Sequence, residues 1–245
     1  MPAAPVVLLH GVGLDRTLWD AFAASLDAET IALDLPGHGA EPALRAPQTL
    51  ADLADDVLRR LPDGAVHLVG FSLGALIAQQ ITVQHPDRVV TLTCVSGVCR
   101  RTDAERAAVQ DRLDSARDDF AASVQASLER WYPAGAGVAA ETIAQTRRTL
   151  LANDVESYLH AYAVFAQADA EIAPRLGEIG CPTLAITGEL DPGSTPDMSR
   201  RLADAVPGAR AMIVPDTRHM LPVERPDALR TALTELISES EGVMR

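Results

Sequence analysis

Short apolar runs alternate with helix-like segments over the first hundred residues of the chain. Apolar runs of strand length occur at residues 5–9, 30–35, 65–69 and 89–95. Segments with apolar side chains three or four positions apart, which predict helices, occur at residues 17–26, 49–61 and 75–84. This alternation is typical of a parallel sheet with helices on both faces.

The pattern changes between residues 98 and 176. This segment has no convincing strand, is rich in Ala, Arg, Asp and Gln at helical spacing, and contains one breaker cluster at residues 133–137. Strand and helix patterns then resume at residues 183–187, 196–205, 211–214 and 226–237. We therefore predict one core domain formed by residues 1–97 and 177–245, with residues 98–176 as an all-helical insertion.

Composition limits the classes of partner. The chain has 245 residues, of which 47% are hydrophobic and 22% charged, so it can bury a sizeable core. Its formal net charge of -13 argues against nucleic acid or an anionic membrane as a partner, but a local arginine can still bind an anionic small molecule. The amino-terminal run has no basic segment before it and is short, so we expect a first strand and a cytoplasmic protein.

Cysteine usage indicates no metal or redox site. Cys94, Cys99 and Cys181 are an odd number of cysteines without metal-like spacing, which favours buried, reduced thiols.

A serine flanked by glycines lies between a predicted strand and a predicted helix. The segment Gly70-Phe71-Ser72-Leu73-Gly74 fits Gly-x-Ser-x-Gly, the nucleophile elbow, in which small residues permit a sharp turn and the serine is held at its tip. The alternative is a serine that only caps the helix.

A serine hydroxyl needs a base, and the base needs an acid to orient it. In the elbow fold these follow in the order Ser, Asp or Glu, His. Asp191 lies in a loop after the strand at residues 183–187, with Glu189 as a nearer competitor. His219 lies in a loop before the last helix and is the predicted base.

The other histidines have different expected roles. His85 precedes a proline at a helix end and is interpreted as structural. His160, inside the helical insertion, faces the substrate, faces solvent or is packed. His10 and His38 lie in glycine-flanked turns, where we expect hydrogen bonds that fix the loops.

Two backbone donors are expected for a developing oxyanion. One is the N–H of Leu73, directly after the serine. The other is the N–H of Val12, with Gly13 as its neighbour, in the turn that follows the first strand.

Together these motifs resemble the α/β-hydrolase superfamily: HGxG, DLPGHG, GFSLG, a loop aspartate, and a late histidine before PVERP. The resemblance covers residues 5–97 and 177–238. It implies a mostly parallel, doubly wound sheet with a helical cap inserted after the sixth strand. The cap of this superfamily usually roofs the active site and determines the substrate.

A narrower similarity is to the 3-oxoadipate enol-lactonase group, through LERWYP and the segment from residue 188 to 229. The wider circle of this group includes hydrolases of small ring-cleavage products, some of them enamide hydrolases. The similarity implies that Trp131 lines the pocket; the alternative is that it packs within the cap.

Several arginines are candidates for binding a substrate carboxylate. Arg218 stands where the superfamily more often has glycine; it tightens the loop, binds a carboxylate or is surface charge. The other candidates are Arg130, Arg147 and Arg148, which are alternatively solvated arginines on cap helices.

The predicted enzyme is a serine hydrolase without metal or organic cofactor, a monomer or homodimer, that cleaves a small ester, lactone or amide. An enol-lactone-like carboxylate from aromatic or heterocycle catabolism fits the resemblance best. Alternatives on the same triad are an enamide amidohydrolase, a C–C bond hydrolase and a cofactor-free haloperoxidase-like enzyme. A catalytically silent ligand-binding protein is the alternative outside enzymes.

Overall fold

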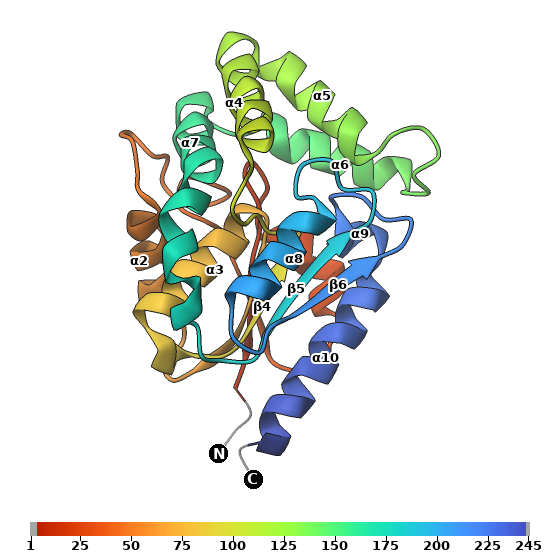
Figure 1. Ribbon diagram of the computed structural model, residues 1–245. Helices are drawn as coiled ribbons and strands as arrows, with labels where there is room; N and C mark the ends of the chain where they lie inside the picture. The colour runs from red at the N-terminus through yellow and green to blue at the C-terminus, as the bar shows by residue number, and fades with distance from the viewer. Residues whose placement is uncertain (1–3, 244–245) are drawn as a thin grey trace.

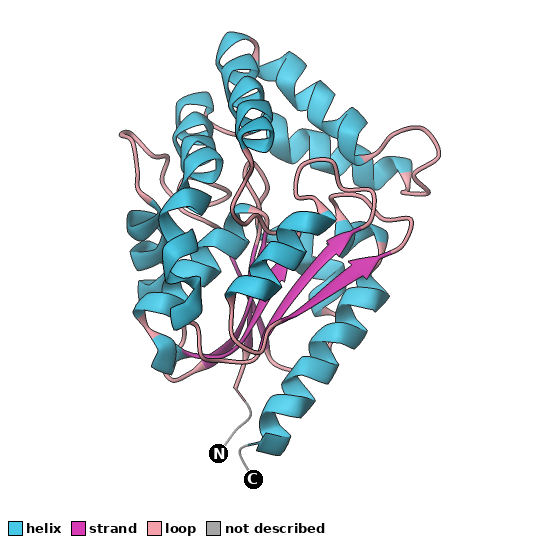
Figure 2. Ribbon diagram, in the orientation of Figure 1, coloured by secondary structure: helices cyan, strands magenta, loops and turns pink. Residues whose placement is uncertain are grey.

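One sheet of six parallel strands forms the centre of the protein (Figures 1 and 2). The computed structural model describes residues 4–243. The strands lie in the order β2-β1-β3-β4-β5-β6, and each neighbouring pair is parallel. They are β1 (Val6–Leu9), β2 (Thr30–Leu33), β3 (Val66–Phe71), β4 (Val89–Val95), β5 (Thr183–Gly188) and β6 (Arg210–Val214). The predicted α/β class with a doubly wound parallel sheet is confirmed.

Helices cover both faces of the sheet because the strand side chains alternate between two apolar layers. In β1, Val7 and Leu9 pack into one layer, and Val6 and Leu8 pack into the other. The first layer is covered by α2 (Leu50–Arg60), α3 (Leu73–Gln84) and α8 (Pro196–Ala205), with the short η2 (Pro86–Arg88) and η3 (Ala173–Glu178) beside them. The second is covered by η1 (Arg16–Trp19), α1 (Asp20–Ala23), α9 (Leu221–Glu224) and α10 (Pro226–Val243).

Local hydrogen bonds determine where two of these helices begin or end. Thr49 and Asp52 form a reciprocal capping box, in which each side chain accepts the other residue's backbone N–H, so α2 begins directly after Thr49. The helix predicted over residues 17–26 is shorter and divided into η1 and α1, which ends at Ala23. Ser25 Oγ donates to the Phe22 carbonyl oxygen at 2.7 Å, a local bond that competes with continuation of the helix.

Four helices form the insertion, and Figure 1 shows three of them, α4 to α6, near the top of the view. They are α4 (Asp103–Asp118), α5 (Phe120–Trp131), α6 (Ala140–Leu151) and α7 (Val155–Ile172). The insertion follows β4, the fourth strand, and not the sixth, because residues 4–95 form only four strands. The assignment of residues 98–176 as a cap separate from the core stays a prediction.

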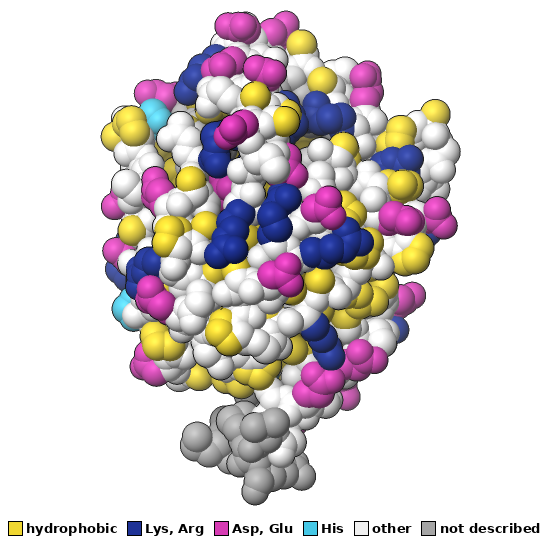
Figure 3. All heavy atoms as spheres, viewed as in Figure 1, with side chains coloured by type: hydrophobic (Ala, Val, Ile, Leu, Met, Phe, Trp, Pro, Cys, Tyr) yellow, Lys and Arg dark blue, Asp and Glu magenta, His cyan; other side chains and the backbone are white. Residues whose placement is uncertain are grey.

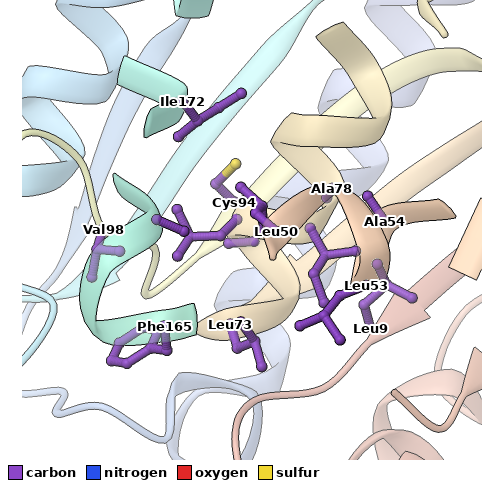
Figure 4. Packing of buried hydrophobic residues seen from close by; sticks show 14 of the residues in the cluster. Leu9, Leu50, Leu53, Ala54, Leu73, Ala78, Cys94, Val98, Phe165 and Ile172 are labelled. Atoms are coloured by element: carbon purple, nitrogen blue, oxygen red, sulfur yellow. The ribbon is translucent and has the colours of Figure 1, made fainter. Parts of the chain in front are cut away.

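The last helix of the insertion packs on the core as well. Figure 4 shows Phe165 and Ile172 of α7 in the same apolar layer as Leu73 of α3. The amino-terminal half of α7 instead contributes Tyr158 and Tyr162 to the main pocket. One helix therefore supports both the roof of the pocket and the core beneath it.

A buried ion pair joins the beginning of the insertion to α7. Arg101 Nη1 lies 2.7 Å from Asp169 Oδ1, and the two side chains are 1% and 0% exposed. The Arg101 backbone N–H also donates to Asp169 Oδ2, at 2.8 Å. The Arg101 guanidinium carbon lies 4.7 Å from the centre of the Phe165 ring. These contacts fix α7 against the segment that leaves β4.

Charge is unevenly distributed on the surface. Figure 3 shows arginine side chains gathered on the face that carries α8, although the chain has a net charge of -13.

Among the helices of residues 4–243, none is long and apolar enough to cross a membrane.

Removing the carboxylate of the buried pair tests its role in the fold. Asp169→Ala leaves the Arg101 guanidinium buried and uncompensated, so we expect the free energy of unfolding to fall by about 3–5 kcal/mol. Urea unfolding measures the change, and Glu178→Ala, which breaks the exposed pair with Arg175, is the control. Equal effects of the two substitutions would contradict this account.

Candidate active site

Ser72 lies at a strained turn between β3 and α3. Its φ is 54°, a left-handed conformation that a serine rarely adopts, and it directly precedes α3. A Cβ on Gly70 would lie 2.2 Å from the Gly74 carbonyl oxygen, and one on Gly74 would lie 2.6 Å from the His10 carbonyl oxygen. Only glycines fit these two positions, so the geometry is that of a nucleophile elbow.

Asp191 and His219 meet beside this turn. His219 Nδ1 lies 2.7 Å from Asp191 Oδ2. The other carboxylate oxygen, Oδ1, accepts the backbone N–H groups of Gly193 and Ser194, both at 2.9 Å. The carboxylate therefore holds the imidazole with its proton on Nδ1, which leaves Nε2 free to accept a proton.

Glu189, the competing acid, does not contact His219 in the described chain. It is exposed and accepts the backbone N–H of Asp216 at 3.3 Å. The geometry therefore favours Asp191 as the residue that orients the imidazole.

The loops that carry the acid and the base are held together by their backbones. The Leu190 N–H donates to the Thr217 carbonyl oxygen at 2.8 Å. A Cβ on Gly188 would lie 2.2 Å from that same oxygen, so the close approach requires a glycine at the end of β5. Ser96 Oγ, after β4, donates to the His219 carbonyl oxygen at 3.0 Å.

Gly188 and Ser96 are positions that the sequence analysis missed. The only signal in the sequence was a small residue directly after a predicted strand. That signal does not say which backbone approaches it.

The two expected oxyanion donors are free. Neither the Val12 N–H nor the Leu73 N–H donates a hydrogen bond to any residue in the described part of the chain. Leu73 is the first residue of α3, where the N–H groups have no partner inside the helix and the helix dipole favours negative charge.

A cavity of about 100 Å³ lies beside Val12 and the Asp191–His219 pair. Its floor includes Val12, Ser72, Asp191 and His219, and its roof is aromatic. The roof residues come from α5 and α7 and are Trp131, Tyr158, Tyr162 and Phe165. The Trp131 ring stacks on His219, with 5.6 Å between ring centres and 25° between planes. Trp131 therefore lines the pocket and covers the imidazole.

Two cap arginines, Arg112 and Arg130, also line the pocket. Arg130 donates to Ser127 Oγ at 2.8 Å, and no carboxylate among residues 4–243 forms an ion pair with either arginine. Burial, and secondly the positive charge of Arg112, lower the pKa of Arg130. Two half-buried cations without a counter-ion suit an anionic ligand. Arg112 was missed because its helix carries seven other arginine or carboxylate side chains, and the sequence does not distinguish it from them.

The comparisons with known proteins agree with this geometry. A model of the α/β hydrolase family matches residues 6–232. The chain belongs to this family.

Two relatives of this α/β hydrolase and the solved structure of a similar protein are informative. The chain is 34% identical over 238 residues to the (E)-2-((N-methylformamido)methylene)succinate hydrolase of Acinetobacter baylyi, which covers 94% of this chain and 88% of that protein. It is 30% identical over 240 residues to a pimeloyl-[acyl-carrier protein] methyl ester esterase of Edwardsiella ictaluri, with 94% and 92% covered. The structure of the enol-lactonase from Burkholderia xenovorans LB400 superposes with a TM-score of 0.87 at 27% identity, over 97% and 92% of the two chains.

The chain is thus an enzyme of the α/β hydrolase family, of the esterase and lactonase type. Both the predicted superfamily and the predicted similarity to enol-lactonases are confirmed.

Four candidate residues of this α/β hydrolase lie outside the lining of the pocket. His160 is two residues beyond Tyr158 in α7, which turns it away from the aromatic roof and toward a groove beside α2. Arg218 donates through its backbone to the Glu224 carboxylate at 3.0 Å, and its side chain does not line the cavity. Arg147 and Arg148 are exposed on α6. The structure therefore gives no support to these four as substrate contacts.

No cluster of three or more metal-ligating side chains occurs within the described residues. Of the cysteines, Cys94 and Cys99 are buried, and burial raises the pKa of the Cys94 thiol to about 12 and that of Cys99 to about 11. Such thiols are not activated as nucleophiles.

His10 and His38 fix the loops beneath the site, as predicted from their turns. His10 Nε2 accepts the Leu35 N–H at 2.8 Å, so its proton is on Nδ1, which donates to the Gly11 carbonyl oxygen at 2.8 Å. Burial, and secondly the adjacent His38, lower the pKa of His10 well below its usual range. Burial lowers the pKa of His38 to about 4.

The neutral histidines predict a loss of stability in mild acid. The unfolded chain binds protons at these rings below about pH 6.5, whereas the folded chain does not bind them at His38 until about pH 4. Between pH 7 and pH 5 the free energy of unfolding should therefore fall, by about 2 kcal/mol for His38 and further for His10. His38→Asn, which retains a donor for the Pro36 carbonyl oxygen, should lose less stability in urea unfolding over this range. An unchanged pH dependence in that variant would contradict the assignment.

Proposed function

We propose that this α/β hydrolase is a serine hydrolase in which Ser72 is the nucleophile, His219 the general base and Asp191 the residue that orients the base. The observation that carries the proposal is the 2.7 Å hydrogen bond between Asp191 and His219, in the pocket that Ser72 lines from a strained elbow. A nucleophile, an oriented base and free N–H donors in one cavity are what acyl transfer requires.

The reaction proceeds in two steps. His219 Nε2 takes the proton of Ser72 Oγ as that oxygen attacks the substrate carbonyl carbon, and the Val12 and Leu73 N–H groups bind the oxyanion. The proton then passes to the leaving oxygen or nitrogen, whose bond to the carbonyl carbon breaks, which leaves an acyl ester on Ser72. A water molecule gives a proton to Nε2 and attacks this ester. Nε2 then returns a proton to Ser72 Oγ as the bond between that oxygen and the acyl carbon breaks, which releases the acid and the free serine.

The proposed substrate is a small ester, lactone or amide that carries at least one carboxylate. Arg112 and Arg130 support this proposal because they face the cavity without a carboxylate of their own. The enol-lactone of an aromatic or heterocycle breakdown product fits a cavity of this size and polarity. The structural neighbour of Burkholderia xenovorans is named an enol-lactonase.

A second candidate is the amide bond of an enamide dicarboxylate. The Acinetobacter baylyi relative is named for a methylformamido-methylene succinate, which carries two carboxylates, and this cavity contains two guanidinium groups. Ester and amide substrates with one or two carboxylates, offered at equal concentration, distinguish the candidates by their kcat/KM values.

Replacing the nucleophile tests the mechanism. Ser72→Ala removes the attacking oxygen, so turnover of a short p-nitrophenyl ester should fall by at least about 10³-fold. Labelling by a fluorophosphonate should be lost as well. Ser25→Ala, a change at an exposed serine, is the matched control, and unfolding curves verify that both variants are folded. Undiminished turnover in Ser72→Ala would disprove the proposal.

Replacing a cap arginine tests the substrate class. Arg130→Gln and Arg112→Gln each remove one charge-assisted hydrogen bond, so KM for carboxylate-bearing esters should rise about 10- to 100-fold. The kcat/KM for p-nitrophenyl acetate, which has no carboxylate, should change by less than about threefold. Arg147→Gln, on the exposed face of α6, should change neither value. A parallel loss on both substrates would argue against a carboxylate site.

A further inference from the structure

The turn that carries the Val12 N–H has an unusual hydrogen-bond pattern. Residues 11–14 form a turn in which the Leu14 N–H donates to the Gly11 carbonyl oxygen at 3.2 Å, and Gly13 has a φ of 75°. These features match a type II turn, whose third residue requires a positive φ. The Gly11 carbonyl and the Val12 N–H belong to one planar peptide group, so whatever holds that carbonyl also aims the N–H.

The core holds this peptide from one side. His10 Nδ1 donates to the Gly11 carbonyl oxygen at 2.8 Å, so that oxygen accepts two hydrogen bonds, from His10 and from Leu14.

The cap holds the turn from the other side. Asn153, in the link between α6 and α7, donates from Nδ2 to the Gly13 carbonyl oxygen at 2.8 Å, across 140 residues of sequence. The same nitrogen lies 3.0 Å from the Thr149 and Leu150 carbonyl oxygens, so three acceptors fix the orientation of its amide. A Cβ on Gly13 would lie 2.8 Å from side-chain atoms of Leu150 and Tyr158, so the cap also presses on the turn.

These contacts form a continuous relay. The Gly13 carbonyl that accepts from Asn153 belongs to the same peptide group as the Leu14 N–H. That N–H donates to the Gly11 carbonyl, which belongs to the same peptide group as the Val12 N–H. Hydrogen bonds in such chains polarise one another, so each accepted bond makes the next N–H a stronger donor.

We infer that Asn153 is a positioning residue that orients and polarises the Val12 N–H through this relay of two peptide groups. The inference rests on the proposed function, because Val12 matters only if it binds an oxyanion. Asn153 does not line the cavity, and it acts on the reaction only through the turn. The oxyanion donor of this enzyme is therefore correctly placed only when the cap is seated on the core.

Two substitutions at residue 153 test the inference. Asn153→Leu removes the donor, and Asn153→Asp keeps the shape but places carboxylate oxygens against three carbonyl oxygens. With a neutral p-nitrophenyl ester we expect kcat to fall about 10- to 100-fold and KM to stay within about twofold, since misplacing a catalytic donor by about 1 Å has effects of this size. The inhibition constant of a trifluoromethyl ketone, whose adduct with serine carries an oxyanion, should rise by the same factor as kcat/KM falls.

The matched control is Ser157→Ala. Ser157 Oγ donates to the Gly37 carbonyl oxygen at 3.0 Å, so it forms a second buried bond from the same part of the cap to the core. None of its hydrogen bonds in the described chain involves residues 11–14. If Asn153 only held the cap in place, Ser157→Ala would lower kcat by a similar factor. That result would overturn the inference, as would unchanged kcat in both Asn153 variants.

Hydrogen exchange separates this inference from the proposed function. Exchange of peptides that contain residues 10–17 should be faster in the Asn153 variants than in the wild type and in Ser157→Ala, whatever the reaction. Unaltered exchange would overturn the relay. If exchange is faster but wild-type turnover survives Ser72→Ala, the proposed function fails while the structural link stands.

Discussion

The close approach of β3 and α3 at the elbow is the constraint on which the site depends. A side chain at Gly70 would collide with the backbone of Gly74, and a side chain at Gly74 would collide with the backbone at the end of β1. The same approach brings the end of β1 against the start of α3, where the Gly74 N–H donates to the His10 carbonyl oxygen at 3.1 Å. Ser72, the free N–H of Leu73 and the turn after β1 therefore meet at one point. Strain at the serine costs about 1–3 kcal/mol, and the buried layers around it maintain it.

Residues at strand ends could be predicted from the sequence. Ser72, Asp191 and His219 each follow a strand of a parallel sheet, and the carboxyl ends of such strands meet at one edge. Their order along the chain was thus enough to bring them together, and the structure does so with a 2.7 Å bond between acid and base. The Val12 turn was predictable for the same reason. The six strands were all found because they are short apolar runs between turns.

Residues whose position depends on helix packing could not be predicted. His160 and Tyr158 lie two positions apart in α7, and only the packing of that helix on α3 decides which one faces the cavity. In the sequence, Arg112 does not differ from a solvated arginine on a helix. Only the position of α4 over the pocket places it in the lining. Asn153 resembles an ordinary helix-end residue, since its partner is 140 residues away. Gly188 has no sequence signal for the loop that passes beside it.

The inserted helices pack on the core and line the pocket, so they are not a detachable lid. Helix α7 packs on the core through Ile172, is fixed by Asp169 to the segment after β4, and presents Tyr158 to the cavity. Helix α5 stacks Trp131 on His219. Trp131 and Asn153 of the insertion contact His219 and the turn at residues 11–14, and Arg112 and Arg130 belong to the insertion themselves. Under the proposed function, changes that reshape the inserted helices for a new substrate therefore also displace the catalytic groups. Under that proposal specificity and rate are coupled, and the core sheet alone would hold Ser72, Asp191 and His219 without the aromatic roof of the pocket.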